Sequence, residues 1–185
     1  MSRSRALGGE VQGRALDAVV TAVSAFAPVT RMRVQSILAS AEILHVTPGD
    51  WYSLDVYVDA LDDIESAVGS AVLWRAGMQL VSDPTEGDER VPTTAGQPSD
   101  TVLAIEQLDE AYTAVHRGGR IGGYEFQPEG RSHGIVVSTT PYPDHFDRGV
   151  LDAAFRRPDG QTLTEVATGD TFGDGSGETT FHVSW

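Results

Sequence analysis

The sequence predicts an α+β fold, in which N-terminal helices pack on an antiparallel four-stranded sheet in the order helices, hairpin, helix, hairpin. Three observations support this prediction. Apolar residues recur with a helical period in several segments between residues 11 and 117, interrupted by a loop over residues 82–99. Residues 122–140 and 162–185 instead form short β-rich segments separated by turn residues. The chain has 185 residues and no cysteine, which suits one domain with a sizeable core and excludes disulfides.

The N-terminal residues predict two helices. Residues 10–28 have the spacing of an amphipathic helix that stops at Pro28. Thr30 is placed to cap a second helix over residues 31–44. We therefore expect a helical extension over residues 1–29, followed by the main domain over residues 30–185.

The next segment predicts three more helices and a loop. An apolar stripe opposite an acidic face indicates a helix over residues 53–69, and a further helix follows over residues 70–81. Residues 82–99 are rich in Pro, Gly, Thr and acidic residues without periodicity, which predicts an exposed acidic loop. A helix over residues 100–117 then ends at a pair of glycines.

The C-terminal third predicts the sheet. Residues 122–130 and 133–140 pair naturally as a hairpin across a Pro-Glu-Gly turn region. A helix follows over residues 147–157. Residues 162–168 and 178–185 then form a second hairpin across a Gly-rich connection.

The charge balance limits the environment and the partners. The formal net charge is -14, from 27 acidic residues against 13 basic residues, all of which are Arg. At molar salt the Debye length is about 3 Å, so this self-repulsion would be screened. We predict a halophilic protein; an acidic mesophilic protein also fits the charge but explains the missing lysine less well. The acidity argues against nucleic acid as a partner and against membrane insertion, and the absence of a signal-like or spanning apolar run predicts a cytoplasmic location.

The stretch "TTPYPDHFDRG" holds the first candidate site residues. Tyr142, His145 and Arg148 converge at a helix start beside a strand, which is a common place to hold a small ligand. Asp144 and Asp147 are also explained as helix-start carboxylates, favoured by the helix dipole. Both interpretations stay open.

The stretch "HRGGRIGGY" holds two further candidates, His116 and Tyr124. Its glycines come between a helix and a strand, the reverse of the order that a phosphate-binding loop needs. It is therefore either a glycine helix end with Arg117 on the last carbonyls, or a segment that faces a pocket. The other histidines are isolated and predicted to be surface or half-buried residues. His145 with Asp144 or Asp147 could also be part of a metal site, but the spacing identifies no third ligand, so we predict no metal site.

Four segments together resemble a known group of proteins: "DWYSLDVYVDALDDIESAVG", "LDEAYTAVHRGGRIGGYEF", "PYPDHFDRGVL" and "FHVSW". They are similar to haloarchaeal members of the group that includes the 4-vinyl reductase domain and heme NO-binding-like proteins, whose fold is shared with small vesicle-tethering subunits. The resemblance covers residues 30–185. It implies helices on an antiparallel sheet, a hydrophobic small-molecule pocket, and a sensory or regulatory role, often as a dimer.

The sequence departs from this group at its cofactor residues. Asp144 and, approximately, Thr171 and Thr179 stand where vinyl-reductase-type relatives place cysteines, so a cysteine-based zinc site is absent. The Tyr-x-Ser-x-Arg motif of the heme-binding branch has no match. We therefore expect no cofactor, neither heme nor zinc.

These observations predict a non-catalytic sensory domain that binds a small, mostly apolar ligand and signals through a homodimer or a protein partner. A scaffold with a filled core is the main alternative. An enzyme that uses His145 and Asp147 as an acid/base pair is a third, and it requires both side chains in one cleft. The predicted ligand-binding residues are Tyr142, His145, Arg148, His116 and Tyr124.

Overall fold

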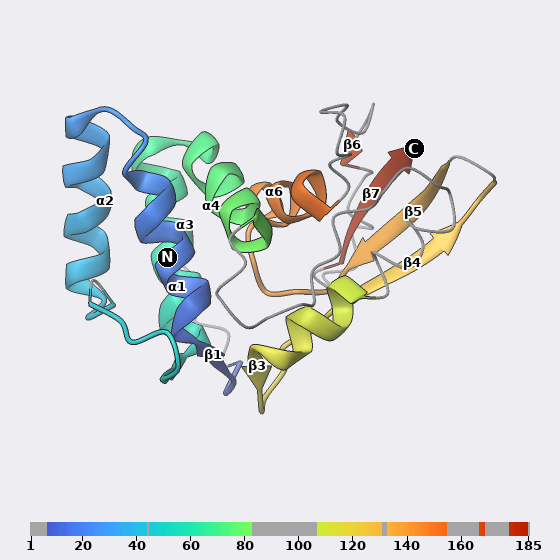
Figure 1. Cartoon of the computed structure of the whole chain (residues 1–185), viewed down its shortest axis with the longest axis horizontal. Coiled ribbons are helices and arrows are strands. Elements are labelled where there is room, and N and C mark those ends of the chain that lie inside the picture. Colours follow the sequence, from blue (N-terminus) through green and yellow to red (C-terminus); the bar gives the residue numbers. More distant parts are fainter. Residues whose placement is uncertain are drawn as a thin grey trace.

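The computed structural model describes residues 7–43, 45–82, 107–130, 133–154, 167–168 and 178–184. The fold is α+β, as predicted, but the strands form two antiparallel sheets instead of one. The smaller sheet has the order β2-β1-β3 and the larger has the order β4-β5-β7-β6. Figure 1 shows α1, α2 and α3 at one end of the molecule, β4, β5 and β7 at the other, and α4 and α6 between them.

The smaller sheet joins three distant segments: β1 (Glu10–Gln12), β2 (Trp51–Ser53) and β3 (His116–Arg117). Val11 pairs with Tyr52 on one side and with His116 on the other. The prediction that residues 10–28 form one helix is therefore wrong at its start. Local periodicity could not reveal this strand, because its hydrogen-bond partners lie far away along the chain.

The helical part contains α1 (Gly13–Val23), α2 (Pro28–Ser40), α3 (Leu54–Val68) and α4 (Ser70–Ser82). Pro28 begins α2 instead of ending the first helix, because the first helical position needs no backbone donor. Thr30 therefore lies inside α2 and does not cap it. Ser53 caps α3 by accepting a hydrogen bond from the backbone of Val56. The predicted boundary after residue 29 falls within the first turn of α2. Helix α2 contacts α1, and α1 also packs on α4.

A close crossing fixes α4 against α6 (Asp144–Ala154). A Cβ atom at Gly77 would lie 2.1 Å from the carbonyl oxygen of Phe146, and one at Gly149 would lie 2.0 Å from that of Trp74. Only glycine allows the two backbones to approach so closely. The indole of Trp74 also donates to the Asp152 carboxylate at 2.6 Å.

The larger sheet contains β4 (Tyr124–Pro128), β5 (His133–Ser138), β6 (Ala167–Thr168) and β7 (Thr179–Ser184). The predicted hairpin of β4 and β5 is confirmed, with Tyr124 opposite Ser138. Strand β7 pairs with both β5 and β6. The rest of the predicted 162–168 strand, and the predicted 82–99 loop beyond Ser82, lie outside the described residues.

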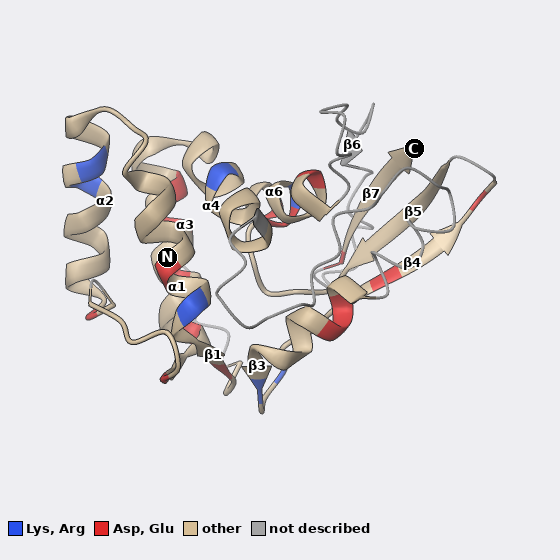
Figure 2. Ribbon diagram, in the orientation of Figure 1, with Lys and Arg blue, Asp and Glu red and all other residues tan. Residues whose placement is uncertain are grey.

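The charged side chains are spread over the helices, strands and connections of the described chain (Figure 2). Asp147 is the one carboxylate among the buried residues of the ranges given above. Within those same ranges, no helix combines the length and the apolar character needed to cross a bilayer.

Candidate functional site

A buried cluster of rings lies where the helices meet the larger sheet. Neighbouring ring centroids in this cluster are 4.0 to 6.1 Å apart, and most of the pairs are edge-to-face or tilted. Such geometries place the positive edge of one ring against the negative face of another. We call this set the aromatic cluster: Tyr57 from α3, Tyr112 from the helix through residues 107–114, His116 from β3, Tyr124 from β4, Tyr142 from the β5–α6 connection, and Phe146 from α6.

His116 brings into the aromatic cluster a ring nitrogen whose lone pair could bind a metal. Its Nδ1 lies 2.6 Å from the carbonyl oxygen of Tyr112. Because a carbonyl oxygen only accepts, Nδ1 carries the proton and Nε2 is left with a lone pair. Nε2 accepts from the hydroxyl of Tyr142 at 2.5 Å. Burial lowers the pKa of His116 to about 4, so the imidazole is neutral at pH 7.

Tyr142 is held in place by its neighbours in the chain and in space. The prolines on both sides restrict the connection between β5 and α6. The Tyr142 ring packs edge-on against Tyr57 at 5.6 Å and against Tyr112 at 6.1 Å, and lies 4.9 Å from Phe146. Burial, followed by the nearby tyrosines and Asp147, raises the pKa of Tyr142, so its hydroxyl stays protonated and donates to His116.

Beside the cluster lies a second polar group, which we call the Asp147 network: Asp147, Tyr124, Ser138 and Thr140. The Tyr124 hydroxyl donates to Oδ1 of Asp147 at 2.6 Å. The hydroxyls of Ser138 and Thr140 donate to Oδ2 at 2.5 and 2.6 Å. Burial raises the pKa of Asp147 to about 6, although all three hydroxyl donors favour the charged form. The network ties α6 to β4 and to the end of β5.

The two carboxylates interpreted as helix-start residues have different environments. Asp144 is exposed at the first position of α6 and accepts from the Thr179 hydroxyl at 2.7 Å. Asp147 also lies in the first turn, but it is buried within the Asp147 network. A helix-start role alone therefore does not describe Asp147.

His145 lies outside the aromatic cluster. Its side chain is half exposed, and its Nδ1 lies 2.7 Å from the carboxylate of Glu65. Asp147 is buried among hydroxyls that belong to other elements. The two residues thus do not share a cleft, which is the arrangement that the acid/base hypothesis requires.

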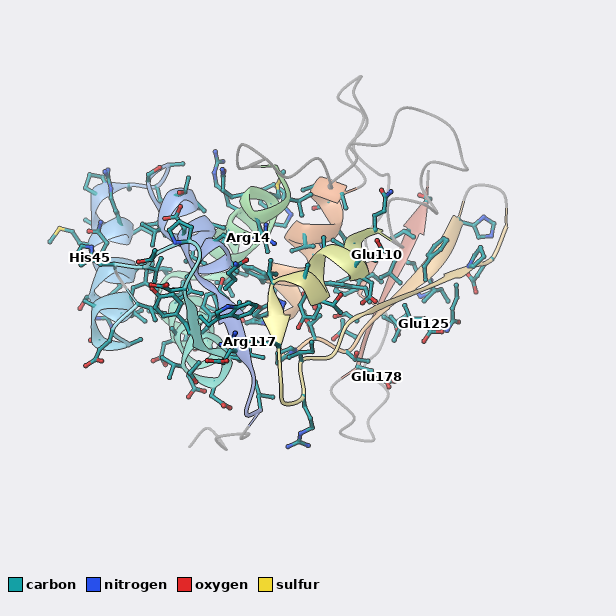
Figure 3. The ribbon with its side chains drawn as sticks, turned by 60° about the horizontal axis from the view of Figure 1, so that its bottom comes forward. Arg14, His45, Glu110, Arg117, Glu125 and Glu178 are labelled. Atoms are coloured by element: carbon teal, nitrogen blue, oxygen red, sulfur yellow. The ribbon has the colours of Figure 1, made fainter. Side chains whose placement is uncertain are left out.

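The structure brings together His116, Tyr124 and Tyr142 and leaves Arg148 exposed on α6. Arg117, next to His116 in β3, points away from the cluster: it pairs with Glu10 at 2.7 Å and lies over the Trp51 ring. Figure 3 shows Arg117 in the middle of the molecule and His45 at its α2 end. The remaining histidines, like His45, are exposed.

Five site residues were not among the predicted ones: Tyr57, Tyr112, Phe146, Ser138 and Thr140. The last two were detectable, because alternate positions at the end of a strand point to the same side. Ser138, Thr140 and Tyr142 follow this two-residue spacing, and all three are buried. Tyr57 and Tyr112 could not be distinguished from ordinary helix core residues.

Several solved structures share this fold. The Fe(II) unliganded H-NOX protein from K. algicida matches with a TM-score of 0.67 and 12% identity, over 94% of this chain and 95% of that one. The S. oneidensis H-NOX protein in the Fe(II)NO ligation state matches with a TM-score of 0.67 and 12% identity, over 94% and 98% of the two chains. No protein-family model matches the sequence, and no curated protein is significantly similar to it.

The likeness to solved H-NOX structures overturns our expectation that heme is not involved. Two other structural neighbours come from work on heme redox potential under porphyrin distortion and on heme distortion in the H-NOX family. Those proteins share the fold at 14% and 12% identity. The heme NO-binding-like part of the resemblance is supported at the level of fold. The vinyl-reductase and haloarchaeal parts stay predictions, and the described chain has the fold of H-NOX proteins.

Proposed function

We propose that this chain is a sensory ligand-binding domain that holds heme at the aromatic cluster, with His116 as the axial ligand. The observation that carries the proposal is the orientation of His116. Its Nδ1 is fixed by a backbone carbonyl, so the lone pair of Nε2 points into the cluster toward Tyr142. Metal-ligating histidines are usually oriented in this way by their second ring nitrogen.

The protonation state and the surroundings of His116 also support the proposal. An imidazole with a pKa of about 4 does not have to lose a proton before it binds a metal at neutral pH. The rings of Tyr57, Tyr112 and Phe146 offer flat apolar contacts of the kind that suit a porphyrin. Bound heme would supply an iron that takes a small gas molecule, and the residues of this chain would hold it and exclude water.

Hemin titration of the full chain tests the proposal. We expect saturable binding at one site, with the absorbance of a histidine-ligated heme. His116→Ala should remove that spectrum, whereas His182→Ala, which changes an exposed histidine on β7, should not. Circular dichroism would confirm that each variant folds. Absence of saturable binding, or an unchanged spectrum in His116→Ala, would refute the proposal.

A scaffold with no ligand is the second candidate, and the packing of the aromatic cluster favours it. The rings already contact one another, and Nε2 of His116 already has a partner. Val29 and Met32 on α2 are 79% and 70% exposed, which would suit a protein contact. Native mass spectrometry separates the candidates: a mass of heme lost on denaturation supports the sensor, and an empty dimer of defined mass supports the scaffold.

A further inference from the structure

Tyr142 occupies the position that a ligand of His116 needs. Its hydroxyl lies 2.5 Å from Nε2 of His116, and both residues are buried. The other nitrogen of His116 is engaged by the carbonyl of Tyr112. Any external group that binds the imidazole must therefore replace the hydroxyl of Tyr142.

We infer that Tyr142 is an internal competitor for His116, and that its hydroxyl sets the affinity of this site for an iron or other Lewis-acid ligand. The inference rests on the proposed function, since it concerns the same histidine. A competitor inside the protein reduces the apparent affinity to the intrinsic affinity multiplied by the fraction of molecules in which the competitor is displaced. Tyr142 is thus a positioning residue that determines affinity.

The surroundings of Tyr142 show what holds the competitor in place. Its backbone N–H lies 3.4 Å from Oγ1 of Thr140, and that hydroxyl donates to Asp147. Pro141 and Pro143 restrict the segment on both sides. Displacement of the Tyr142 side chain would therefore act on the connection that leads directly into α6. Ligand binding at His116 would reach α6 by this route.

The chain offers a matched pair of variants for the test. Tyr142→Phe removes the hydroxyl that caps His116 and keeps the ring. Tyr57→Phe removes a buried hydroxyl from the same cluster, but that hydroxyl donates to the backbone of Ala15 at 2.9 Å and not to His116. Both variants keep the aromatic packing, so they differ in the contact with Nε2.

Hemin titration of the full chain gives the first measurement. The loss of one neutral hydrogen bond corresponds to roughly tenfold in affinity. We expect Tyr142→Phe to bind hemin roughly tenfold more tightly than the wild type, and Tyr57→Phe to bind within about twofold of it. The added affinity should disappear in the double variant Tyr142→Phe with His116→Ala, because the gain acts through Nε2.

NMR of the histidine ring nitrogens gives a second measurement that does not depend on heme. In the ligand-free protein, the Nε2 resonance of His116 should move toward that of an unbonded nitrogen in Tyr142→Phe and stay in place in Tyr57→Phe. An unchanged Nε2 resonance in Tyr142→Phe would overturn the inference.

The outcomes of the titration separate the two claims. Equal affinities for the wild type and Tyr142→Phe would overturn the inference and leave the heme proposal standing. Binding by Tyr142→Phe but not by the wild type would refute heme as a ligand of the wild-type chain and would still support Tyr142 as the competitor at Nε2 of His116. If no variant binds hemin, the heme proposal fails and the inferred control of affinity fails with it.

Discussion

Two buried polar groups belong to this core, and they are satisfied in different ways. Asp147 is 2% exposed and accepts from three hydroxyls, which come from β4, the end of β5 and the connection that follows it. His116 is 4% exposed and has one backbone partner and one side-chain partner. The carboxylate is thus enclosed by its own fold, whereas the imidazole keeps one contact that a ligand can take over. The difference separates a structural anchor from the proposed binding site.

The largest expected effect is on the Asp147 side of this comparison. Asp147→Ala leaves the hydroxyls of Tyr124, Ser138 and Thr140 without their acceptor inside the core. We expect this to lower the free energy of unfolding by about 3 kcal/mol or more. His116→Phe should cost less, about 2 kcal/mol, because it leaves fewer groups unpaired. Urea unfolding at pH 7 measures both. A cost for Asp147→Ala no greater than that of the control Asp144→Ala, which removes an exposed carboxylate, would contradict the anchor role.

The pH dependence of stability should have opposite signs for the two groups. The pKa of Asp147 is raised from 3.8 to about 6, so the folded state binds its proton more tightly and this contribution to stability grows as the pH falls from about 6 to 4. The pKa of His116 is lowered from 6.5 to about 4, so its contribution shrinks as the pH falls through the same range. Each contribution is roughly 3 kcal/mol.

Two variants expose these opposing contributions. In Asp147→Asn, acidification from pH 7 to pH 4.5 should lower the free energy of unfolding relative to the wild type, because the effect of His116 is no longer offset. In His116→Phe, the same acidification should raise it relative to the wild type. Urea unfolding at several pH values measures the difference, since the other carboxylates contribute equally to all three proteins. Parallel pH profiles would show that neither group titrates as described.

A smaller loss of stability is expected when the hydroxyl of Tyr124 or of Tyr142 is removed. Tyr124→Phe removes a donor to a carboxylate and should cost about 2 kcal/mol, whereas Tyr142→Phe removes a donor to a neutral imidazole and should cost about 1 kcal/mol. Thermal unfolding of the two variants tests this order. A reversed order would mean that His116 depends on its hydroxyl partner more than Asp147 does.

The smallest effect concerns the exposed pair of His145 and Glu65. Glu65→Gln should change stability by less than about 1 kcal/mol, because both side chains are partly in water and the contact is screened by salt. Its measurement needs unfolding curves at low and high salt. A loss as large as that of Asp147→Ala would mean that this surface contact matters as much as the buried network.

The sequence predicted best what depends on neighbouring residues. The third helix, its end at Gly69 and the β4–β5 hairpin follow from local periodicity and turn residues, and the structure has them. The Tyr142 candidate also came from its local setting between two prolines. The smaller sheet was missed because its strands have two or three residues each and pair across long stretches of chain.

The candidate site was predictable in part for the same reason. His116 and Tyr124 were selected because they stand in a Gly-rich turn, and the structure places both in the aromatic cluster. Nothing local indicates that Asp147 is buried, since an acidic residue in the first turn of a helix is usually exposed. Its burial follows from the hydroxyls of Ser138 and Thr140, which face it only after α6 has packed on the sheet.

The pairing of β1 with β3 also sets an order of events during synthesis. Val11 pairs with His116, which the ribosome adds about 105 residues later. At about 5 to 20 residues per second, β1 waits roughly 5 to 20 s for β3, although β2 can pair with it earlier. During this interval β1 can pair with β2 on one side but has no strand on the other. The strand that completes the edge of the smaller sheet also carries His116, so the proposed axial ligand arrives in the same late step that closes this sheet, before Tyr142 and Phe146 of the aromatic cluster are added.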